Sequence, residues 1–352
     1  MKLPRITILA TLLLTVPAAA QLQITPPATT PSPPAEKQKA KPPPKKKEAA
    51  PAPKPSASPK PALPATVIPA PPTDNSNVDL VFGAYQRGQY KTAFELATAR
   101  AQAGDPKAMT MLGELYSNAM GIKRDYAKAL EWYKRASDAG DREAMFALAM
   151  MRIAGRGGPV DKGEAVKLMA SAAKLGEPKA AYNLALLYLD GQTLPQDVKR
   201  SAELLRQAAD AGLPEAQYAL ATFYKEGTGV PKDPERAVRL LQAASLTDNV
   251  DAEVEYAIAL FNGTGTPKNQ PAAVALLRKA SRQGSAIAQN RLAWVLINGM
   301  GTPVDKVEGF KWHLVAKTAG KGDPELDKQL SDLPAEDRAK AEAAARKWLG
   351  AK

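Results

Sequence analysis

A unit of 36 residues occurs six times in succession in this 352-residue chain, with no insertion or deletion between the copies. Two series of alanines mark the period: Ala108, Ala144, Ala180, Ala216, Ala252 and Ala288, and Ala136, Ala172, Ala208, Ala244, Ala280 and Ala316. A fixed period of this length is typical of stacked supersecondary units that bury their apolar faces against their neighbours. The sequence therefore predicts a solenoid of six repeats over residues 105–320.

Each repeat has the pattern of two helices, as residues 213–248 illustrate. Apolar side chains three or four positions apart indicate a buried stripe on each helix: Ala216, Leu220, Ala221 and Tyr224, then Ala237, Leu240, Leu241 and Ala244. Gly227 suits a left-handed C-terminal cap of the first helix. Asp or Asn is available to cap the second helix in every unit, at Asp125, Asp161, Asp197, Asp233, Asn269 and Asp305. We expect one antiparallel helix pair per repeat.

The two ends of the array depart from the repeat. Residues 77–104 have the pattern of a partial leading helix pair, and residues 321–352 that of closing helices. The terminal units of a solenoid must cover an apolar face that no further repeat buries. We expect Trp348 to cover that face at the C-terminal end.

The first twenty residues have the pattern of a signal peptide. Lys2 and Arg5 precede an apolar run at residues 6–16, and Ala18 and Ala20 suit a cleavage site after Ala20. A run of about eleven residues is too short to cross ~30 Å of hydrocarbon, which disfavours an uncleaved membrane anchor. The sequence predicts an exported protein, located in the periplasm or alternatively secreted.

Residues 21–76 contain seventeen prolines, eight lysines and three acidic residues. This composition is typical of a disordered, extended linker, because it offers almost no large apolar side chain to bury. A solubilising spacer is one interpretation. The other is weak attachment of the basic segment to an anionic envelope polymer or a membrane surface, at a range limited by ionic screening.

The overall composition excludes several classes of site. The net charge is +12, but the signal contributes +2 and the linker +5, which leaves +5 for residues 77–352 and gives no reason to expect nucleic-acid binding. The chain has no cysteine, so disulfides, thiolate metal sites and cysteine nucleophiles are excluded. The expected stability therefore comes from packing.

The repeats resemble Sel1-like repeats, which are related to tetratricopeptide repeats and have longer, glycine-bearing loops. The first unit carries the resemblance at Ala108, Leu112-Gly113, Tyr116, Asp125, Lys128-Ala129, Trp132-Tyr133 and Ala136, and later units at the pairs Gly227/Gly229, Gly263/Gly265 and Gly299/Gly301. It covers residues 105–320 and, more weakly, 79–104. It implies a right-handed α-solenoid that acts mainly as a protein-interaction scaffold, often in bacterial envelopes. The third unit departs from the pattern at Thr193, and the fourth at Asp248, which replaces the closing glycine.

Two features that suggest chemistry have a simpler structural interpretation. Loops such as Gly227-Thr228-Gly229 invite comparison with phosphate-binding loops, but helices precede them where that motif needs a strand. His313, the sole histidine, falls at the repeat position of Tyr133, Met169, Leu205, Leu241 and Leu277, which is a packing position. We therefore predict no catalytic residue, no metal site and no small-molecule cofactor.

The candidate site is a groove along the first helices, which line the concave face in tetratricopeptide solenoids. Two series are expected to point outward, Thr110, Phe146, Tyr182, Tyr218, Val254 and Asn290, and Glu114, Met150, Leu186, Thr222, Ile258 and Trp294. The proposed anchors are Phe146, Met150, Tyr182, Leu186, Tyr218, Ile258 and Trp294, with Lys107, Lys179, Lys225 and Glu226 as a polar rim. The alternative is that the tyrosines pack between repeats.

These observations lead to three functional hypotheses. The first is a non-enzymatic scaffold that binds a protein or peptide in this groove, with a periplasmic regulator of a membrane sensor as its narrower form. The second is an envelope-binding module held by the basic linker. The third is a hydrolase, because some cysteine-rich members of the family have been proposed to act on β-lactams. This chain lacks those cysteines and shows no nucleophile–base pair.

Overall fold

The structure is a computed structural model that describes residues 76–247 and 249–350. The predicted signal peptide, the linker up to Asn75 and Asp248 lie outside the described residues. Residues 76–352 form one compact unit. Within the described part of this unit there are sixteen α-helices and no β-strand. The all-α prediction is confirmed.

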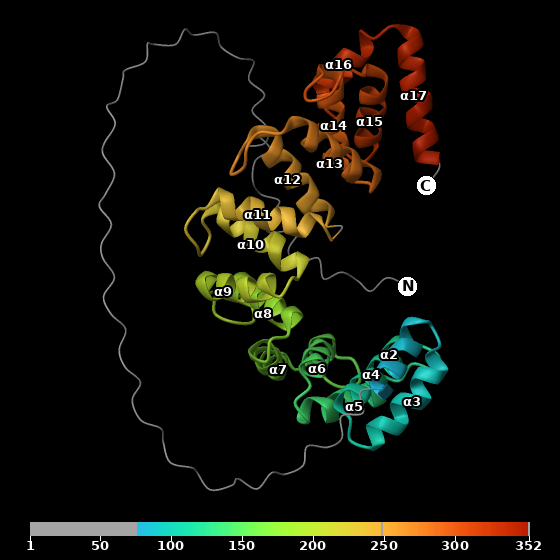
Figure 1. Cartoon of the computed structure of the whole chain (residues 1–352), viewed down its shortest axis with the longest axis vertical. Helices are drawn as coiled ribbons and strands as arrows, with labels where there is room; N and C mark the ends of the chain where they lie inside the picture. The colour runs from blue at the N-terminus through green and yellow to red at the C-terminus, as the bar shows by residue number, and fades with distance from the viewer. Residues whose placement is uncertain (1–75, 248, 351–352) are drawn as a thin grey trace, which may run out of the picture. The chain divides into compact units, whose positions relative to one another are not determined.

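The helices alternate between first and second members of antiparallel pairs, which follow one another in chain order (Figure 1). Their bounds are α2 (Ser76–Gln86), α3 (Tyr90–Gln102), α4 (Pro106–Asn118), α5 (Tyr126–Asp138), α6 (Arg142–Ala154), α7 (Lys162–Lys174), α8 (Pro178–Asp190), α9 (Val198–Asp210), α10 (Pro214–Glu226), α11 (Pro234–Ser245), α12 (Val250–Asn262), α13 (Gln270–Arg282), α14 (Ala286–Asn298), α15 (Lys306–Thr318), α16 (Pro324–Ser331) and α17 (Ala335–Gly350).

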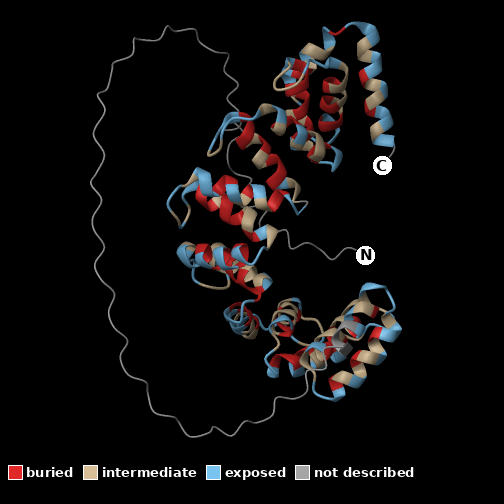
Figure 2. Cartoon of the chain, in the orientation of Figure 1, coloured by how far each residue is buried: buried red, intermediate tan, exposed pale blue. Residues whose placement is uncertain are grey.

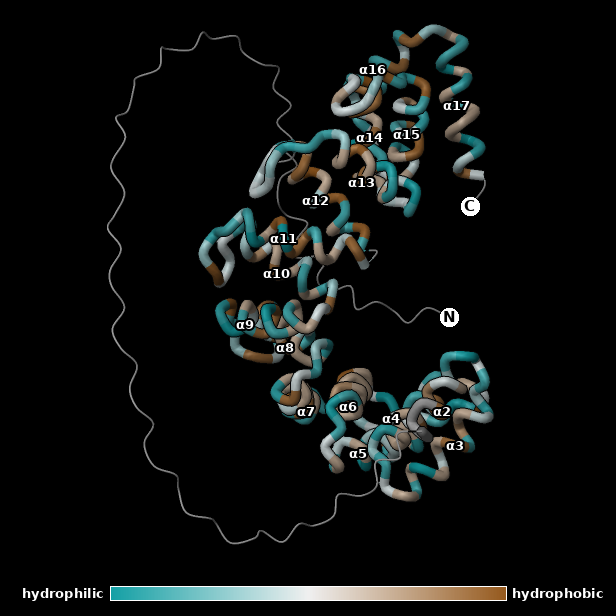
Figure 3. Tube along the Cα trace, in the orientation of Figure 1, coloured by the Kyte–Doolittle hydropathy of each residue, from teal (hydrophilic) through white to brown (hydrophobic). Residues whose placement is uncertain are grey.

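From α2 to α15, each helix packs mainly on its neighbours in chain order, as stacked units must, and α17 packs on α15. The buried positions form stripes on the facing sides of neighbouring helices (Figure 2). Hydrophobic segments alternate with hydrophilic ones along each helix, as expected when a single stripe is buried (Figure 3). The predicted stripes in residues 213–248 are buried, except that Leu240 is only half-buried.

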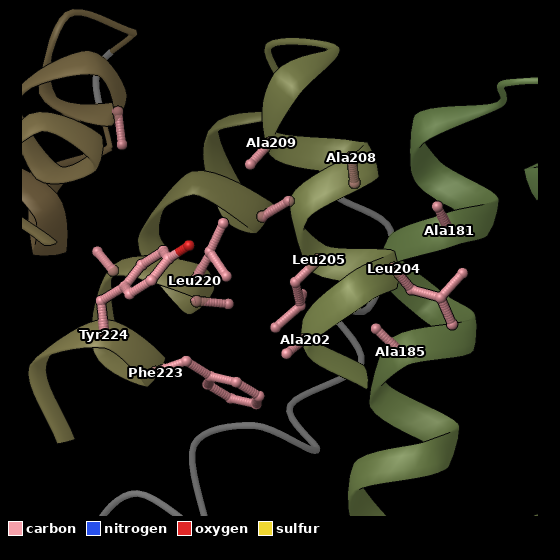
Figure 4. Packing of buried hydrophobic residues seen from close by; sticks show 14 of the residues in the cluster. Ala181, Ala185, Ala202, Leu204, Leu205, Ala208, Ala209, Leu220, Phe223 and Tyr224 are labelled. Carbon is pink, nitrogen blue, oxygen red and sulfur yellow. The ribbon is translucent and has the colours of Figure 1, made fainter. Parts of the chain in front are cut away.

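Small residues at the helix contacts allow close packing in the middle of the array. Around α9, the side chain of Leu204 points towards the alanines of α8, and that of Leu205 lies on the side of the larger side chains of α10 (Figure 4). Leu205 is completely buried. Because alanine keeps the helix axes close and leucine fills the remaining space, one continuous core extends from repeat to repeat.

Helix ends are set by the residues that the sequence indicated. The six predicted second-helix caps accept hydrogen bonds from backbone N–H groups in the first turn of α5, α7, α9, α11, α13 and α15. Gly227 has φ 81° and caps α10 in the left-handed conformation, as predicted. The phosphate-loop interpretation is therefore replaced by helix capping.

The second loop glycine has a separate role in stacking. A Cβ atom on Gly229 would lie 2.6 Å from the carbonyl oxygen of Val198, the first residue of α9 in the preceding pair. The equivalent Gly157 and Gly265 approach the carbonyl oxygens of Tyr126 and Pro234 in the same way. The loop thus packs on the preceding second helix by backbone-to-backbone contact, for which the glycine must lack a side chain.

The third repeat replaces this glycine by Thr193 and builds its loop differently. Asp190 accepts a hydrogen bond from the backbone N–H of Gln192 (2.8 Å), and the Gln196 side chain donates to the carbonyl oxygen of Leu189 (2.9 Å). These side-chain bonds satisfy backbone groups at the end of α8.

We expect Ala119→Gly to stabilise the protein by about 1 kcal/mol. Ala119 caps α4 with φ 57° and is the one residue other than glycine with positive φ in the described residues. The later repeats have glycine at this position, and Ala119 is exposed, so no packing is lost. The matched control is Ala139→Gly at the cap of α5, where φ is −83° and glycine should destabilise. Denaturant unfolding of both variants checks the prediction, and a loss of stability in both would contradict it.

Candidate functional site

The first helices of successive pairs share one surface. This surface, the first-helix face, carries the two predicted outward series from Thr110 to Asn290 and from Glu114 to Trp294, except for the buried Val254. Hydrogen bonds join neighbouring first helices along it: Tyr85 of α2 donates to Glu114 of α4 (2.7 Å), Thr110 donates to Asp141 at the start of α6 (3.0 Å), and Lys225 of α10 donates to Glu255 of α12 (3.1 Å).

The proposed anchors lie along this face with part of each side chain accessible. All seven are half-buried: Phe146, Met150, Tyr182, Leu186, Tyr218, Ile258 and Trp294. The rim residues Lys107, Lys179, Lys225 and Glu226 are exposed. The first helices thus carry half-buried apolar and aromatic side chains together with exposed charged ones.

Tyr182 and Tyr218 also contribute to the core. Both rings pack against the central buried cluster, together with Phe146. The alternative that these tyrosines fill space between repeats is therefore correct for one side of each ring. The remainder of each ring is accessible at the surface, and packing against the core limits the freedom of both rings.

Two predicted positions differ in the structure. Val254 was expected to point outward, but only 4% of it is exposed, because it packs into the core of the array. Trp294 is half-buried but belongs to the C-terminal closure: its indole N–H donates to Asp323 at the start of α16 (2.9 Å). Asn290 donates to the carbonyl oxygen of Lys321 nearby (3.2 Å). Both side chains therefore take part in contacts with the C-terminal end of the array.

The predicted rim included only Glu226 from a group of carboxylates on α10 and α12. Burial raises the pKa of Tyr218, and the carboxylates of Glu255, Asp251 and Glu226 add to this effect. Burial likewise raises the pKa of Tyr182, with a contribution from Glu215. Both hydroxyls are thus held neutral beside negative charge. Glu215 and Asp251 precede the Tyr218 and Val254 positions by three residues, a spacing from which the sequence alone indicates a shared face.

The Sel1 repeat pattern matches residues 106–141, 142–177, 178–213, 214–246, 250–285 and 286–321. The chain belongs to the Sel1 repeat family. The six matches coincide with the six periods found in the sequence, displaced by one residue, and the fourth ends at Leu246, before the departure at Asp248. Sel1 repeats generally form non-enzymatic scaffolds for protein–protein interaction.

A solved structure shows the same fold. A Sel1 repeat protein from Oxalobacter formigenes is 27% identical, with a TM-score of 0.61 over 69% of this chain and 99% of that one. The protective antigen c5321 of uropathogenic Escherichia coli is 22% identical, with a TM-score of 0.49, and the match covers 74% of this chain and 64% of that one. Among curated proteins, none matches the chain.

The sole histidine of this Sel1 chain stabilises its C-terminal end. His313 is completely buried, and its Nε2 atom lies 2.8 Å from Asp327 of α16. Asp327 also accepts a hydrogen bond from Lys317 (2.8 Å), and this bond, followed by that to His313, lowers the pKa of the Asp327 carboxyl. The predicted packing position is confirmed, while the partner Asp327 was not anticipated.

Trp348 packs edge-on against Trp312, with ring centroids 5.0 Å apart, and so covers the end as predicted.

Neither a metal centre nor a spanning segment occurs in the described Sel1 array. Residues 76–247 and 249–350 contain no group of three or more His, Asp or Glu side chains placed to hold a metal ion. In the same residues, no helix combines the length and apolar character needed to cross a bilayer.

A shallow pocket of about 520 Å³ lies between α11 and the loop that follows α12, lined in part by Glu235, Arg239 and Pro267.

Proposed function

We propose that the protein is an exported Sel1 scaffold that binds a protein or peptide on its first-helix face, without catalysing a reaction. The observation that carries this proposal is the row formed by Phe146, Met150, Tyr182, Leu186 and Tyr218, which is half-buried throughout. All of these residues except Leu186 also pack against a buried core cluster. Rigid aromatic anchors of this kind supply much of the energy at protein interfaces. The family assignment supports the same class of function.

We further propose that the partner is a protein of the cell envelope, and in particular a membrane sensor that this protein restrains in the periplasm. The signal-like pattern of residues 1–20 supports export, and the proline-rich residues 21–76 provide a spacer long enough to reach a partner at a distance. Crosslinking in intact cells, followed by fractionation, tests this location. Recovery of the crosslinked protein in the cytoplasm would contradict it.

The variant Tyr182→Ala with Tyr218→Ala should bind the partner at least about tenfold more weakly, because truncating a central aromatic anchor usually costs more than 1 kcal/mol. Crosslinking mass spectrometry on the exported protein first identifies the partner, and binding is then measured by titration. Circular dichroism establishes that the variant is still folded. The matched control is Tyr126→Ala, which truncates a half-buried tyrosine of a second helix.

A photo-crosslinking residue gives a test that does not depend on truncating core contacts. It is placed at the exposed position of Lys179 on the first-helix face and, in a second protein, at the exposed position of Lys199 on α9. Crosslinks from position 179 but not from 199 support the proposal. Crosslinks from 199 alone would place the partner on the second helices and overturn it.

A second function is favoured by the eight lysines of residues 21–76. These lysines suit weak attachment to an anionic polymer or a membrane surface. Deleting residues 21–75 separates the two roles: envelope association should be lost while partner binding through the first-helix face is retained. Loss of both together would mean that the two roles are not independent.

A further inference from the structure

Charge is distributed unequally between the two kinds of helix in the middle of the array. The first helices α10 and α12 carry five carboxylates and one lysine: Glu215, Glu226, Asp251, Glu253, Glu255 and Lys225. The second helices α11 and α13 carry the reverse, one carboxylate and five basic residues: Glu235, Arg236, Arg239, Arg278, Lys279 and Arg282. The first-helix face is therefore locally negative in a chain of net charge +12.

This negative charge is only partly neutralised within the described residues. Lys225 forms an ion pair with Glu255, and the buried Glu253 forms one with Lys279. No hydrogen bond or ion pair from another described residue engages the carboxylates of Glu215, Glu226 or Asp251 (residues 76–247 and 249–350), and all three residues are exposed. They lie near Tyr182 and Tyr218, and their negative charge contributes to the raised pKa of these two hydroxyls.

The same carboxylates do not converge as metal ligands would. In the part of the chain that the structure describes, no three acidic or histidine side chains are placed to hold one cation. Carboxylates spread along two helices beside tyrosine rings instead match several positive charges carried on an extended chain. Aromatic faces also attract lysine and arginine side chains, which adds to the charge complementarity.

We infer that the α10–α12 part of the first-helix face binds a lysine- or arginine-bearing extended segment of the partner protein. The apolar row on α6 and α8, from Phe146 to Leu186, then receives the apolar residues of the same segment, and the change from apolar to acidic surface along the array fixes its direction. This inference rests on the proposed function, because it names the chemistry of the partner for that face. Of the three rim lysines, Lys107 on α4 and Lys179 on α8 lie outside the α10–α12 part, and Lys225 on α10 pairs with Glu255.

The test uses the full chain and synthetic peptides of about twelve residues, long enough at ~3.3 Å per residue to cross several helices. In the first peptide lysine alternates with leucine and proline, and in a matched peptide glutamate replaces each lysine. Fluorescence anisotropy measures binding to the wild type and to the triple variant Glu215→Gln, Glu226→Gln, Asp251→Asn. The matched control neutralises three exposed carboxylates of second helices, Asp138→Asn, Asp210→Asn and Glu235→Gln.

We expect the lysine peptide to bind the wild type, and the triple variant to bind it about tenfold more weakly, since three exposed pairs contribute up to ~1 kcal/mol each. The control variant should change binding by less than about twofold, and binding should weaken as salt rises from about 50 to about 500 mM. Equal binding of both peptides, or equal losses in the two variants, would overturn the inference.

The partner found by crosslinking separates this inference from the proposed function. If the Tyr182→Ala, Tyr218→Ala variant loses the partner while the triple carboxylate variant keeps it, the first-helix face is the binding site and the basic-segment inference is wrong. If neither variant loses the partner, the proposed function itself fails. Loss in both variants, with the control unchanged, supports both.

Discussion

Gly229→Ala should destabilise the repeat array by about 3 kcal/mol, because it combines a steric clash with an unfavourable backbone conformation. The new Cβ atom would lie 2.6 Å from the carbonyl oxygen and 3.0 Å from the carbonyl carbon of Val198, and these backbone atoms cannot rotate away. At φ 66° an L-residue is also strained. The loop would have to lift from α9 and loosen the contact between two pairs.

Gly212→Ala is the matched control. Gly212 has φ 84°, but a Cβ atom there would meet nothing within 4 Å, so the substitution should cost only the backbone strain of roughly 1 kcal/mol. Urea unfolding of both variants measures the difference. Equal losses would show that the loop of one repeat does not depend on close contact with the helix before it.

Lys279→Met should destabilise the protein by about 3 kcal/mol, because it leaves a buried carboxylate without its charged partner. Glu253 of α12 is completely buried, and its side chain pairs with the Lys279 ammonium of α13. Its second oxygen, Oε2, has no hydrogen-bond partner. Methionine retains the apolar stem of the lysine, so the loss reports on charge and not on packing.

The double variant Lys279→Met with Glu253→Gln tests this explanation. Removing the buried charge as well should recover at least about 1 kcal/mol of the loss, as a double-mutant cycle would show. Arg282→Met, on the exposed side of the same helix, should change stability by less than about 0.5 kcal/mol. If the double variant were as unstable as the single one, Lys279 would act by packing alone.

The fold could be predicted in detail because its determinants are local and repeated. The second-helix caps act within one turn of helix, so an aspartate at the right spacing identifies each start. Gly227 at a left-handed helix end is a similar local signal. Six copies of the pattern make each of these signals specific.

The prediction of the site was less complete, because exposure depends on neighbours distant in sequence. Val254 and Tyr218 occupy the same repeat position, yet the first is buried and the second half-buried. The sequence predicts that Trp294 is an accessible aromatic residue. In the structure its indole N–H donates a hydrogen bond to Asp323 at the start of α16. The predicted rim included Glu226 but omitted Glu215 and Asp251, although both occupy the same repeat position as the rim residues Lys107 and Lys179.

The sequence by itself determined the repeat, the pairing of helices and the family, because these follow from spacing along the chain. Only the tertiary structure decided which side chains of the first helices remain accessible, which carboxylates gather around Tyr218 and why a second loop glycine is needed at Gly229. These properties arise where one helix pair meets the next. Such a contact joins residues about 30 positions apart, as Lys225 and Glu255 show, and its geometry is fixed by packing between repeats and not by the pattern within one.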